Sequence, residues 1–389
     1  MKEKFLRELA DIQTGPFGSQ LHKEDYVADG TPIVTVEHLG NKMFSEQNLP
    51  RVSNTDKNRL KKYVLKQGDI VFSRVGSVDR CSYVDQKHDG WMFSGRCLRV
   101  RPTSEIDSEY LYYYFCLEET KQFVRNIAVG ATMPSINTKL LGEVVVTFPE
   151  LEQQKRISGI LSAIDSKIEV NQKINDNLYA QVKAIFSKNF LDLDFLPDGW
   201  KTGNLLDIAD YLNGLAMQKY RPKDGETGLP VLKIKELRQG ICDASSELCS
   251  PSIKSEYIIH DGDIIFSWSG SLLVDIWCGG NCGLNQHLFK VTSNNYDKWF
   301  YYLWTAHHLD RFIAVAADKA TTMGHIKREE LEKVEVIIPS KCDYKRIGAL
   351  IKPLFDLIIS NRIENRKLTA LRNTFCQRLW PGKLMCLIS

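Results

Sequence analysis

An internal repeat constrains the fold of this chain more than any other feature of its sequence. The segment Tyr63–Ser73 (YVLKQGDIVFS) returns 194 residues later as Tyr257–Ser267 (YIIHDGDIIFS). Shorter echoes follow in the same order: Thr132-Met133 matches Thr322-Met323, and Lys155-Arg156-Ile157 matches Lys345-Arg346-Ile347. A period this long exceeds the roughly 20–50 residues of a solenoid unit, so the pattern predicts a duplicated half-protein.

Length and composition fit this interpretation. At roughly 150 residues per domain, 389 residues allow two or three domains. Apolar residues make up 43% and charged residues 25%, which argues against a disordered or fibrous chain. The net charge is only +3, so any surface that binds a polyanion must be local. The charged start Met1–Glu8 and the lack of about 18 consecutive apolar residues predict a soluble, cytoplasmic protein without a membrane span.

Each half has the same internal order: short strands with turn signals, an aromatic segment, and a long helical segment. Gly68-Asp69 and Gly262-Asp263 are expected to be turns that feed apolar strands. The aromatic segments 110–115 and 299–304 are expected to be core helices, with base stacking as the alternative. We therefore predict a mixed α/β (α+β) fold with a domain at 1–149, a helix at 150–190, a second domain at 196–339 and a C-terminal helix at 340–380.

The two helical segments share a heptad seam. Residues recur at alternating steps of four and three at Ile157, Leu161, Ile164, Ile168, Asn171, Asn175, Leu178, Val182 and Ile185, and again at Ile347, Ile351, Leu354, Ile358, Asn361, Asn365, Leu368, Arg372 and Phe375. A seam Asn costs stability unless it meets a polar partner, so the duplicated Asn residues favour pairing of the two helices as a coiled coil. Docking of each helix on its own domain is the alternative. Pro353 is expected to kink the second helix or to end its first turn.

Several kinds of enzyme site are missing from the sequence. A DNA methyltransferase needs a Gly-rich cofactor loop and an Asn/Asp-Pro-Pro-aromatic tetrapeptide, and an ATPase of the common type needs a Gly-x-x-x-x-Gly-Lys loop; none occurs. Asp69 with Asp85 and Lys87 imitates a nuclease metal site, although such triplets are common. Cys242, Cys249, Cys278 and Cys282 contain only one zinc-like spacing, Cys278 to Cys282, so we expect ordinary thiols and no metal.

Matched polar loops follow strands in both halves and are candidates for DNA contact. Arg suits guanine and Asn or Gln suits adenine, because these pairs form two hydrogen bonds, while basic loop tips suit phosphate. The predicted contacts are Gln20, Lys23, Arg74, Ser77, Arg80, Arg96, Thr132 and Lys139 in the first half, and Gln218, Lys219, Arg221, Trp268, Ser269, Asn285, Gln286, His287, Thr322 and Lys327 in the second.

These motifs together resemble a known family, the specificity subunits of type I restriction-modification systems. The likeness is carried by Gly15–Ser19 (GPFGS), Gly68–Gly76 (GDIVFSRVG), Gln153–Ile157 (QQKRI) and Leu284–Phe289 (LNQHLF), in the expected order over essentially the whole chain. The second half departs from the pattern where Cys342-Asp-Tyr344 replaces Glu-Gln-Gln and where Pro353 interrupts the helix. These departures affect the start of the second helix.

The resemblance implies two target-recognition domains, each followed by a long helix, with the helices antiparallel as a spacer. Each domain would read one half of a split, asymmetric site in double-stranded DNA. The chain itself would have no active site or cofactor. Modification subunits would bring S-adenosylmethionine, and restriction subunits would use ATP and magnesium. A stand-alone nuclease or methyltransferase, and a coiled-coil adaptor that does not bind DNA, are the alternatives from other functional classes.

Overall fold

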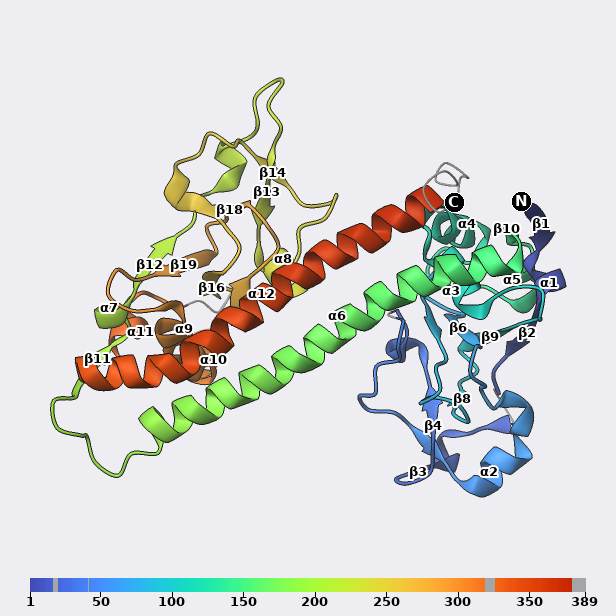
Figure 1. Ribbon diagram of the computed structural model, residues 1–389, viewed down its shortest axis with the longest axis horizontal. Helices are drawn as coiled ribbons and strands as arrows, with labels where there is room; N and C mark the ends of the chain where they lie inside the picture. Colours follow the sequence, from blue (N-terminus) through green and yellow to red (C-terminus); the bar gives the residue numbers. More distant parts are fainter. Residues whose placement is uncertain (17–19, 41, 319–325, 380–389) are drawn as a thin grey trace. The chain divides into compact units, whose positions relative to one another are not determined.

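The computed structural model describes residues 1–16, 20–40, 42–318 and 326–379, without the side chains of Lys23, Asp318 and residues 377–379. It divides into two compact units, one made of Met1–Ser166 with the chain from Thr369 onward, the other of Lys167–Leu368. Each unit holds one mixed α/β domain, as the sequence repeat predicts (Figure 1). Within the described ranges, no helix is both apolar and long enough to span a bilayer.

The first domain contains two small sheets and a strand pair. Its elements are β1 (Lys2–Phe5), α1 (Leu6–Leu9), β2 (Ala10–Thr14), η2 (Lys23–Asp25), β3 (Tyr26–Val27), β4 (Thr31–Val34), η3 (Val36–His38), β5 (Arg51–Val52), α2 (Asn54–Arg59), η4 (Lys61–Tyr63), β6 (Ile70–Ser73), β7 (Cys81–Tyr83), β8 (Met92–Phe93), β9 (Cys97–Pro102), α3 (Ser108–Cys116), α4 (Glu118–Ile127), α5 (Thr138–Gly142) and β10 (Val145–Phe148). One sheet has the antiparallel order β2-β9-β6-β7, and the other has the order β3-β5-β4-β8 with β4 and β8 parallel. β1 pairs with β10.

The second domain repeats most of this topology, with a different edge strand in its mixed sheet. Its elements are β11 (Lys201–Asn204), α7 (Leu205–Ile208), β12 (Asp210–Asn213), η6 (Met217–Lys219), β13 (Leu229–Leu232), α8 (Ile234–Gln239), β14 (Leu248–Cys249), η7 (Ser255–Tyr257), β15 (Ile258–Ile259), β16 (Asp263–Ser267), β17 (Leu273–Trp277), β18 (Cys282–Leu284), β19 (Leu288–Thr292), α9 (Lys298–His307), α10 (Leu309–Asp318), α11 (Glu329–Glu332) and β20 (Glu335–Ile338). The sheets are β12-β19-β16-β17 and β14-β13-β18-β15, with β13 and β18 parallel. β11 pairs with β20.

Local side-chain chemistry is duplicated along with the topology. The Gly-Asp turns form as expected: the Asp69 carboxylate accepts the Lys66 amide at 2.8 Å, and the Asp263 carboxylate accepts the His260 amide at 2.9 Å. Each turn leads directly into a buried strand, β6 or β16. A carboxylate that accepts a nearby backbone N–H stabilises a turn without help from the rest of the fold.

The aromatic segments form the core helices α3 and α9, as predicted. All six residues from Tyr110 to Phe115 are buried, as are all six from Trp299 to Trp304. They pack against the four-stranded antiparallel sheet of their own domain. Rings buried in this way are not available to stack on bases.

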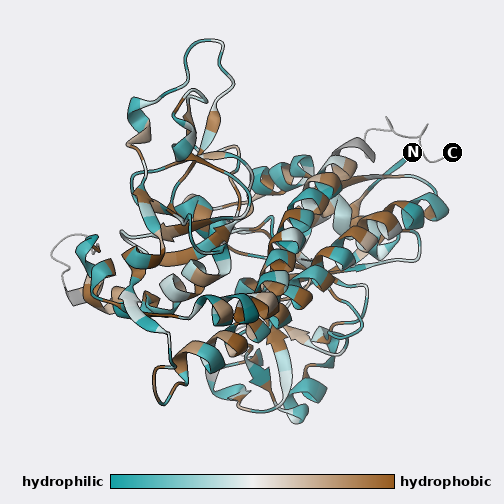
Figure 2. Ribbon diagram, turned by 60° about the vertical axis from the view of Figure 1, so that its left-hand side comes forward, coloured by the Kyte–Doolittle hydropathy of each residue, from teal (hydrophilic) through white to brown (hydrophobic). Residues whose placement is uncertain are grey.

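Two long helices complete the fold, α6 (Leu151–Phe186, continued by the π-helical turn η5, Ser187–Leu191) and α12 (Lys341–Leu379). Figure 2 shows apolar and hydrophilic residues alternating along both. Pro353 lies inside α12, which runs through it, so the expectation that it ends the first turn is wrong. α12 bends in its N-terminal part (Figure 1), as a helix that lacks one hydrogen bond at proline commonly does.

Candidate nucleic-acid interface

A glycine anchors a polar loop at the same place in each domain. The Gly15 amide donates to the Cys97 carbonyl at 3.2 Å, and the Gly214 amide donates to the Leu288 carbonyl at 3.0 Å. A Cβ atom at Gly15 would lie 2.2 Å from the Ser94 oxygen, and one at Gly214 would lie 2.2 Å from the Asn285 oxygen. Only glycine allows the two backbones to come this close.

In the first domain, three of the predicted loops join through backbone hydrogen bonds. The Arg74 amide donates to the Arg96 carbonyl at 2.8 Å, and the Ile136 amide donates to the Arg74 carbonyl at 2.9 Å. The Arg74 guanidinium also donates to the Gly95 carbonyl at 3.2 Å. The structure thus brings the loops of Arg74, Arg96 and Thr132 together, with the side chains of Arg96 and Thr132 exposed.

The other predicted residues of the first domain have different surroundings. Arg80 donates to the Leu39 carbonyl, so its guanidinium is engaged within the fold. Gln20 accepts a hydrogen bond from the Tyr63 hydroxyl at 2.6 Å. Ser77 is exposed beside Arg80, and Lys139 is exposed on α5. The side chain of Lys23 lies outside the described part of the chain.

In the second domain, Trp268 takes the place of Arg74. Its indole Nε1 donates to Asn213 Oδ1 at 3.0 Å, its carbonyl accepts the Ile326 amide at 3.0 Å, and its ring lies 6.1 Å from that of His287. Gln286 Nε2 lies 3.2 Å from His287 Nε2. A large flat side chain flanked by hydrogen-bonding groups suits contact with a base edge or ring.

Two predicted contacts of this domain are buried. Asn285 is 7% exposed and its Oδ1 accepts the His287 amide at 3.2 Å, so its side chain closes a turn. Ser269 is 4% exposed. The expectation that these two side chains face a ligand is therefore wrong, and Trp268, Gln286 and His287 are the accessible members of the cluster.

The remaining predicted residues of the second domain form no single cluster. Gln218 and Lys219 are exposed on η6, and Lys327 is exposed before α11. Arg221 pairs with Glu247 at 3.4 Å, a carboxylate that also binds Lys233 at 2.6 Å. Thr322 lies outside the described residues.

Sequence reasoning missed two features near these loops. Asn213, the last residue of β12, holds the Trp268 ring and has no motif around it. The basic run from Lys57 to Lys66 lies next to the first loop, and its signal was available as five basic residues within ten positions.

The nuclease-like triplet has a structural role. Both Asp69 oxygens accept hydrogen bonds from the Arg101 guanidinium, each at 2.7 Å, and Asp85 bonds to His88. Asp69 and Asp85 are therefore held by a guanidinium and an imidazole within the fold. Among the described residues, no three His, Cys, Asp or Glu side chains are arranged to hold a metal.

The predicted seam positions lie between the two long helices. In the second unit, Asn171 Nδ2 donates to Asn365 Oδ1 at 2.8 Å and Asn361 Nδ2 donates to Asn175 Oδ1 at 2.9 Å. Residue numbers fall on one helix as they rise on the other, so this stretch is antiparallel. In the first unit, Arg372 of α12 donates to Asp165 of α6 at 2.7 Å.

The other seam residues are buried or half-buried: Ile157, Leu161, Ile164, Ile168, Leu178, Ile347, Ile351, Leu354, Ile358 and Leu368. The helices also enter the domain cores. Val182 and Phe186 of α6 pack into the core of the second unit, and Cys376 of α12 packs into the core of the first. A polar pair at the centre of an apolar seam fixes its register.

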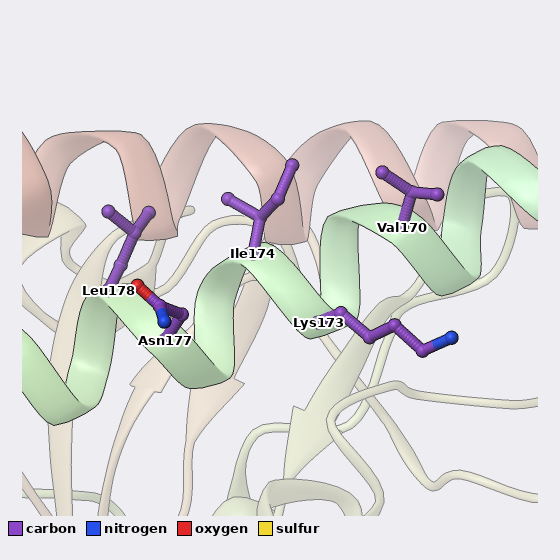
Figure 3. A pocket seen from close by; sticks show the side chains of 5 residues that line it. All are labelled: Val170, Lys173, Ile174, Asn177 and Leu178. Carbon is purple, nitrogen blue, oxygen red and sulfur yellow. The ribbon is translucent and has the colours of Figure 1, made fainter.

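An apolar groove runs along the outer part of α6 in the second unit. It is lined by Val170, Lys173, Ile174, Asn177 and Leu178. Val170 is 49% exposed and Ile174 is 40% exposed. Figure 3 shows Val170, Ile174 and Leu178 rising from one side of the helix while Lys173 extends away. An apolar stripe of this kind suits a partner helix.

Comparison with known proteins gives a consistent result. A family model described as a type I restriction modification DNA specificity domain matches residues 1–180 and 197–371. The chain is 27% identical over 310 residues to the type I restriction enzyme MjaIX specificity subunit of Methanocaldococcus jannaschii, covering 73% of this chain and 71% of that protein. It is 24% identical over 409 residues to the putative type I restriction enzyme MjaX specificity subunit of the same organism, covering 97% and 93%.

Among solved structures, the S subunit of a type I restriction-modification system from M. genitalium has the same fold. The TM-score is 0.59 at 16% sequence identity, and the match covers 98% of this chain and 96% of that one.

Proposed function

The chain belongs to the family of type I restriction-modification specificity subunits, and from this membership we propose how it reads its DNA target. Its role is DNA specificity within a restriction-modification complex, and it is not itself catalytic. We propose that each domain reads one half of a bipartite, asymmetric site. This proposal is carried by the contact of Gly15 and of Gly214 with a neighbouring backbone oxygen. The contact is the same in both domains, but the loops that it holds together present different side chains.

The difference between the two clusters explains an asymmetric site. The first presents Arg74 and Arg96, which suit guanine or phosphate, and the second presents Trp268, Gln286 and His287. Side chains of such different chemistry do not favour the same base pairs. Two halves with one fold therefore read two different half-sites.

We further propose the partners that supply the chemistry. Modification subunits would bring S-adenosylmethionine for base methylation, and restriction subunits would use ATP and magnesium for translocation and cleavage. Because these partners act on cellular DNA, we expect the assembly in the cytoplasm. The paired helices would set the gap between the half-sites, and the groove at Val170 and Ile174 would dock a helix of a modification subunit.

A domain replacement tests the proposal. Residues 1–145 are replaced by the recognition domain of another family member, and the chain is expressed with its modification subunit in a host whose methylated bases are then mapped. We expect one half of the methylated sequence to change while the other half and the gap remain. Changed bases in both halves, or no sequence-specific methylation by the unaltered complex, would contradict the proposal.

A further inference from the structure

The first domain carries a strongly basic surface that the loop analysis did not include. We call it the α2 basic surface: Lys57, Arg59, Lys61, Lys62 and Lys66, from α2, η4 and the turn that follows. All are exposed except Lys57, which is half-buried. Between residues 54 and 66 the only acidic residue is Asp56, which pairs with Arg59 at 2.8 Å. The four lysines form no ion pair with any side chain that the structure describes.

This surface connects directly to the candidate nucleic-acid interface. The Arg59 guanidinium donates to the Gln20 carbonyl at 2.9 Å, and the Tyr63 hydroxyl donates to Gln20 Oε1 at 2.6 Å. Gly15, five residues before Gln20, rests on the backbone of Ser94 next to Arg96. Two residues close together in the sequence therefore contact the Arg74–Arg96 cluster and the α2 basic surface.

The second domain shows that the fold does not need this charge. With the 194-residue shift of the repeat, Pro251, Ile253, Ser255 and Glu256 stand where the first domain has Lys57, Arg59, Lys61 and Lys62. Residues 248–260 contain one Lys and one Glu, so their formal charge is zero with His neutral. Nevertheless η7 forms at the position of η4, and the order of the antiparallel sheet is the same, although no helix stands at the position of α2 between β14 and η7. The 3-10 turn and the antiparallel sheet that both domains share therefore form without this charge.

We propose that the α2 basic surface binds DNA phosphates beyond the outer end of the half-site read by the first domain. This inference rests on the proposed DNA-reading function and adds an asymmetric, sequence-independent contact to it. Lysine suits this task because a flexible point charge meets phosphate oxygens without needing the planar geometry that base reading requires. The second domain lacks the contact on its own side of the target.

The test uses the specificity chain assembled with its modification subunits. The variant Lys57→Gln/Lys61→Gln/Lys62→Gln removes three charges from the surface. The matched control, Lys201→Gln/Lys223→Gln/Lys254→Gln, removes three exposed charges from the second domain. Affinity is measured against salt concentration on duplexes that are full length, or trimmed outside one half-site or the other.

We expect the surface variant to lower the slope of log affinity against log salt by about 2 to 3, since each phosphate contact contributes roughly 0.9. The unaltered complex loses affinity when the duplex is trimmed outside the first domain's half-site, and the surface variant does not respond to that trimming. The methylated sequence stays the same. A surface variant with the control's slope and trimming response would overturn the inference.

A graft decides the question even if the triple variant folds poorly. Ser255→Lys/Glu256→Lys places lysines at the exposed second-domain positions that match Lys61 and Lys62. The graft should raise affinity and make it sensitive to trimming on the second domain's side; an unchanged affinity would count against the inference. If the unaltered complex reads no bipartite site at all, the proposed function fails instead, so the two failures are distinguishable.

Discussion

The loop cluster of each domain depends on a glycine, Gly15 or Gly214, because a Cβ atom at either position would overlap the neighbouring backbone. We expect Gly15→Ala to disturb only the first cluster and Gly214→Ala only the second, because each added methyl group would overlap a carbonyl oxygen at 2.2 Å. The backbone shift should cost about 1–3 kcal/mol of unfolding free energy. Urea unfolding and methylation mapping measure the two effects. The control Gly159→Ala, on α6 with no atom within 4 Å of the added Cβ, should stabilise by about 0.5–1 kcal/mol.

A half-buried imidazole gives the second domain a pH dependence. His308 stacks on Trp304 with ring centroids 5.9 Å apart, and its Nε2–H donates to the Glu335 carbonyl at 2.9 Å. Burial lowers the pKa of His308 from 6.5 to about 4. Between these values the unfolded chain binds a proton that the folded chain does not. The contribution of His308 to the unfolding free energy is therefore fully present above pH 6.5, and it is lost as the pH falls from 6.5 toward 4.

The measurement is the unfolding free energy followed by tryptophan fluorescence from pH 8 to pH 5. Compared with a His308→Phe variant, the unaltered protein should lose more stability in the acidic part of this range. Parallel curves for the two proteins would show that His308 does not contribute.

Residue-scale prediction from sequence had a clear limit. Arg96 and His287 occupy matching turns, and their loops could be found from the repeat alone. The burial of Asn285 and the engagement of Arg80 with Leu39 could not, because burial depends on the packing of the folded domain and Leu39 lies 41 residues from Arg80. Polar residue type marks a loop as a candidate, but the partners of its side chain decide what it can bind.

At the scale of elements, the seam asparagines make a sharp prediction about the paired helices. Asn361→Leu removes the donor that Asn175 Oδ1 accepts at 2.9 Å, so unfolding should become easier by about 1–3 kcal/mol. The double variant Asn175→Leu/Asn361→Leu replaces both partners and should recover most of the loss. Urea unfolding of the three proteins measures this. Equal stabilities of the single variant and the unaltered protein would contradict the role of the pair.

Two ion pairs attach the second domain to α12. Arg362 of α12 binds both oxygens of Asp275 at 2.8 and 2.7 Å, and Arg366 binds both oxygens of Asp261 at 2.6 and 2.8 Å. Bidentate pairs fix orientation as well as position. We expect Arg366→Ala to destabilise the second unit by about 1.5–3 kcal/mol and Arg366→Lys to recover only part of it. Thermal unfolding compares them.

The seam asparagines and the arginine ion pairs differ in how far the sequence could predict them. The Asn positions repeat between the helices, so the seam could be predicted from spacing. The positions that match Arg362 and Arg366 on α6 are Gln172 and Asp176, so the ion pairs belong to one half only and no repeat could indicate them. A sequence repeat predicts the features that both halves share, such as the seam asparagines, but it cannot predict contacts that occur in one half only.

For the whole molecule, a net charge of +3 conceals an uneven distribution. The sequence predicted the duplicated fold and its family because topology is recorded in long-range repeats of strand and helix. It did not predict that the first domain carries the α2 basic surface while the second is neutral there, because total charge averages over the copies. A protein that reads two different half-sites with one fold must differ between its halves in such local features.

The proposed division of labour between domains and helices gives the last prediction. A seven-residue insertion in α6 and a matching one in α12, placed opposite each other, preserves the heptad seam. Because a helix rises about 1.5 Å per residue, the pair lengthens by about 10 Å, which is about three base pairs at ~3.4 Å each. The mapped methylation target should keep both half-sites and gain that length in its gap.

An insertion in one helix alone is the control. It moves the Asn pairs out of register and should abolish sequence-specific methylation, because buried amides then face apolar residues. If the double insertion folds and assembles but the gap stays the same, the spacing is set by the domains or by the partner subunits. A changed gap with unchanged half-sites shows that sequence reading and spacing reside in separate parts of one chain.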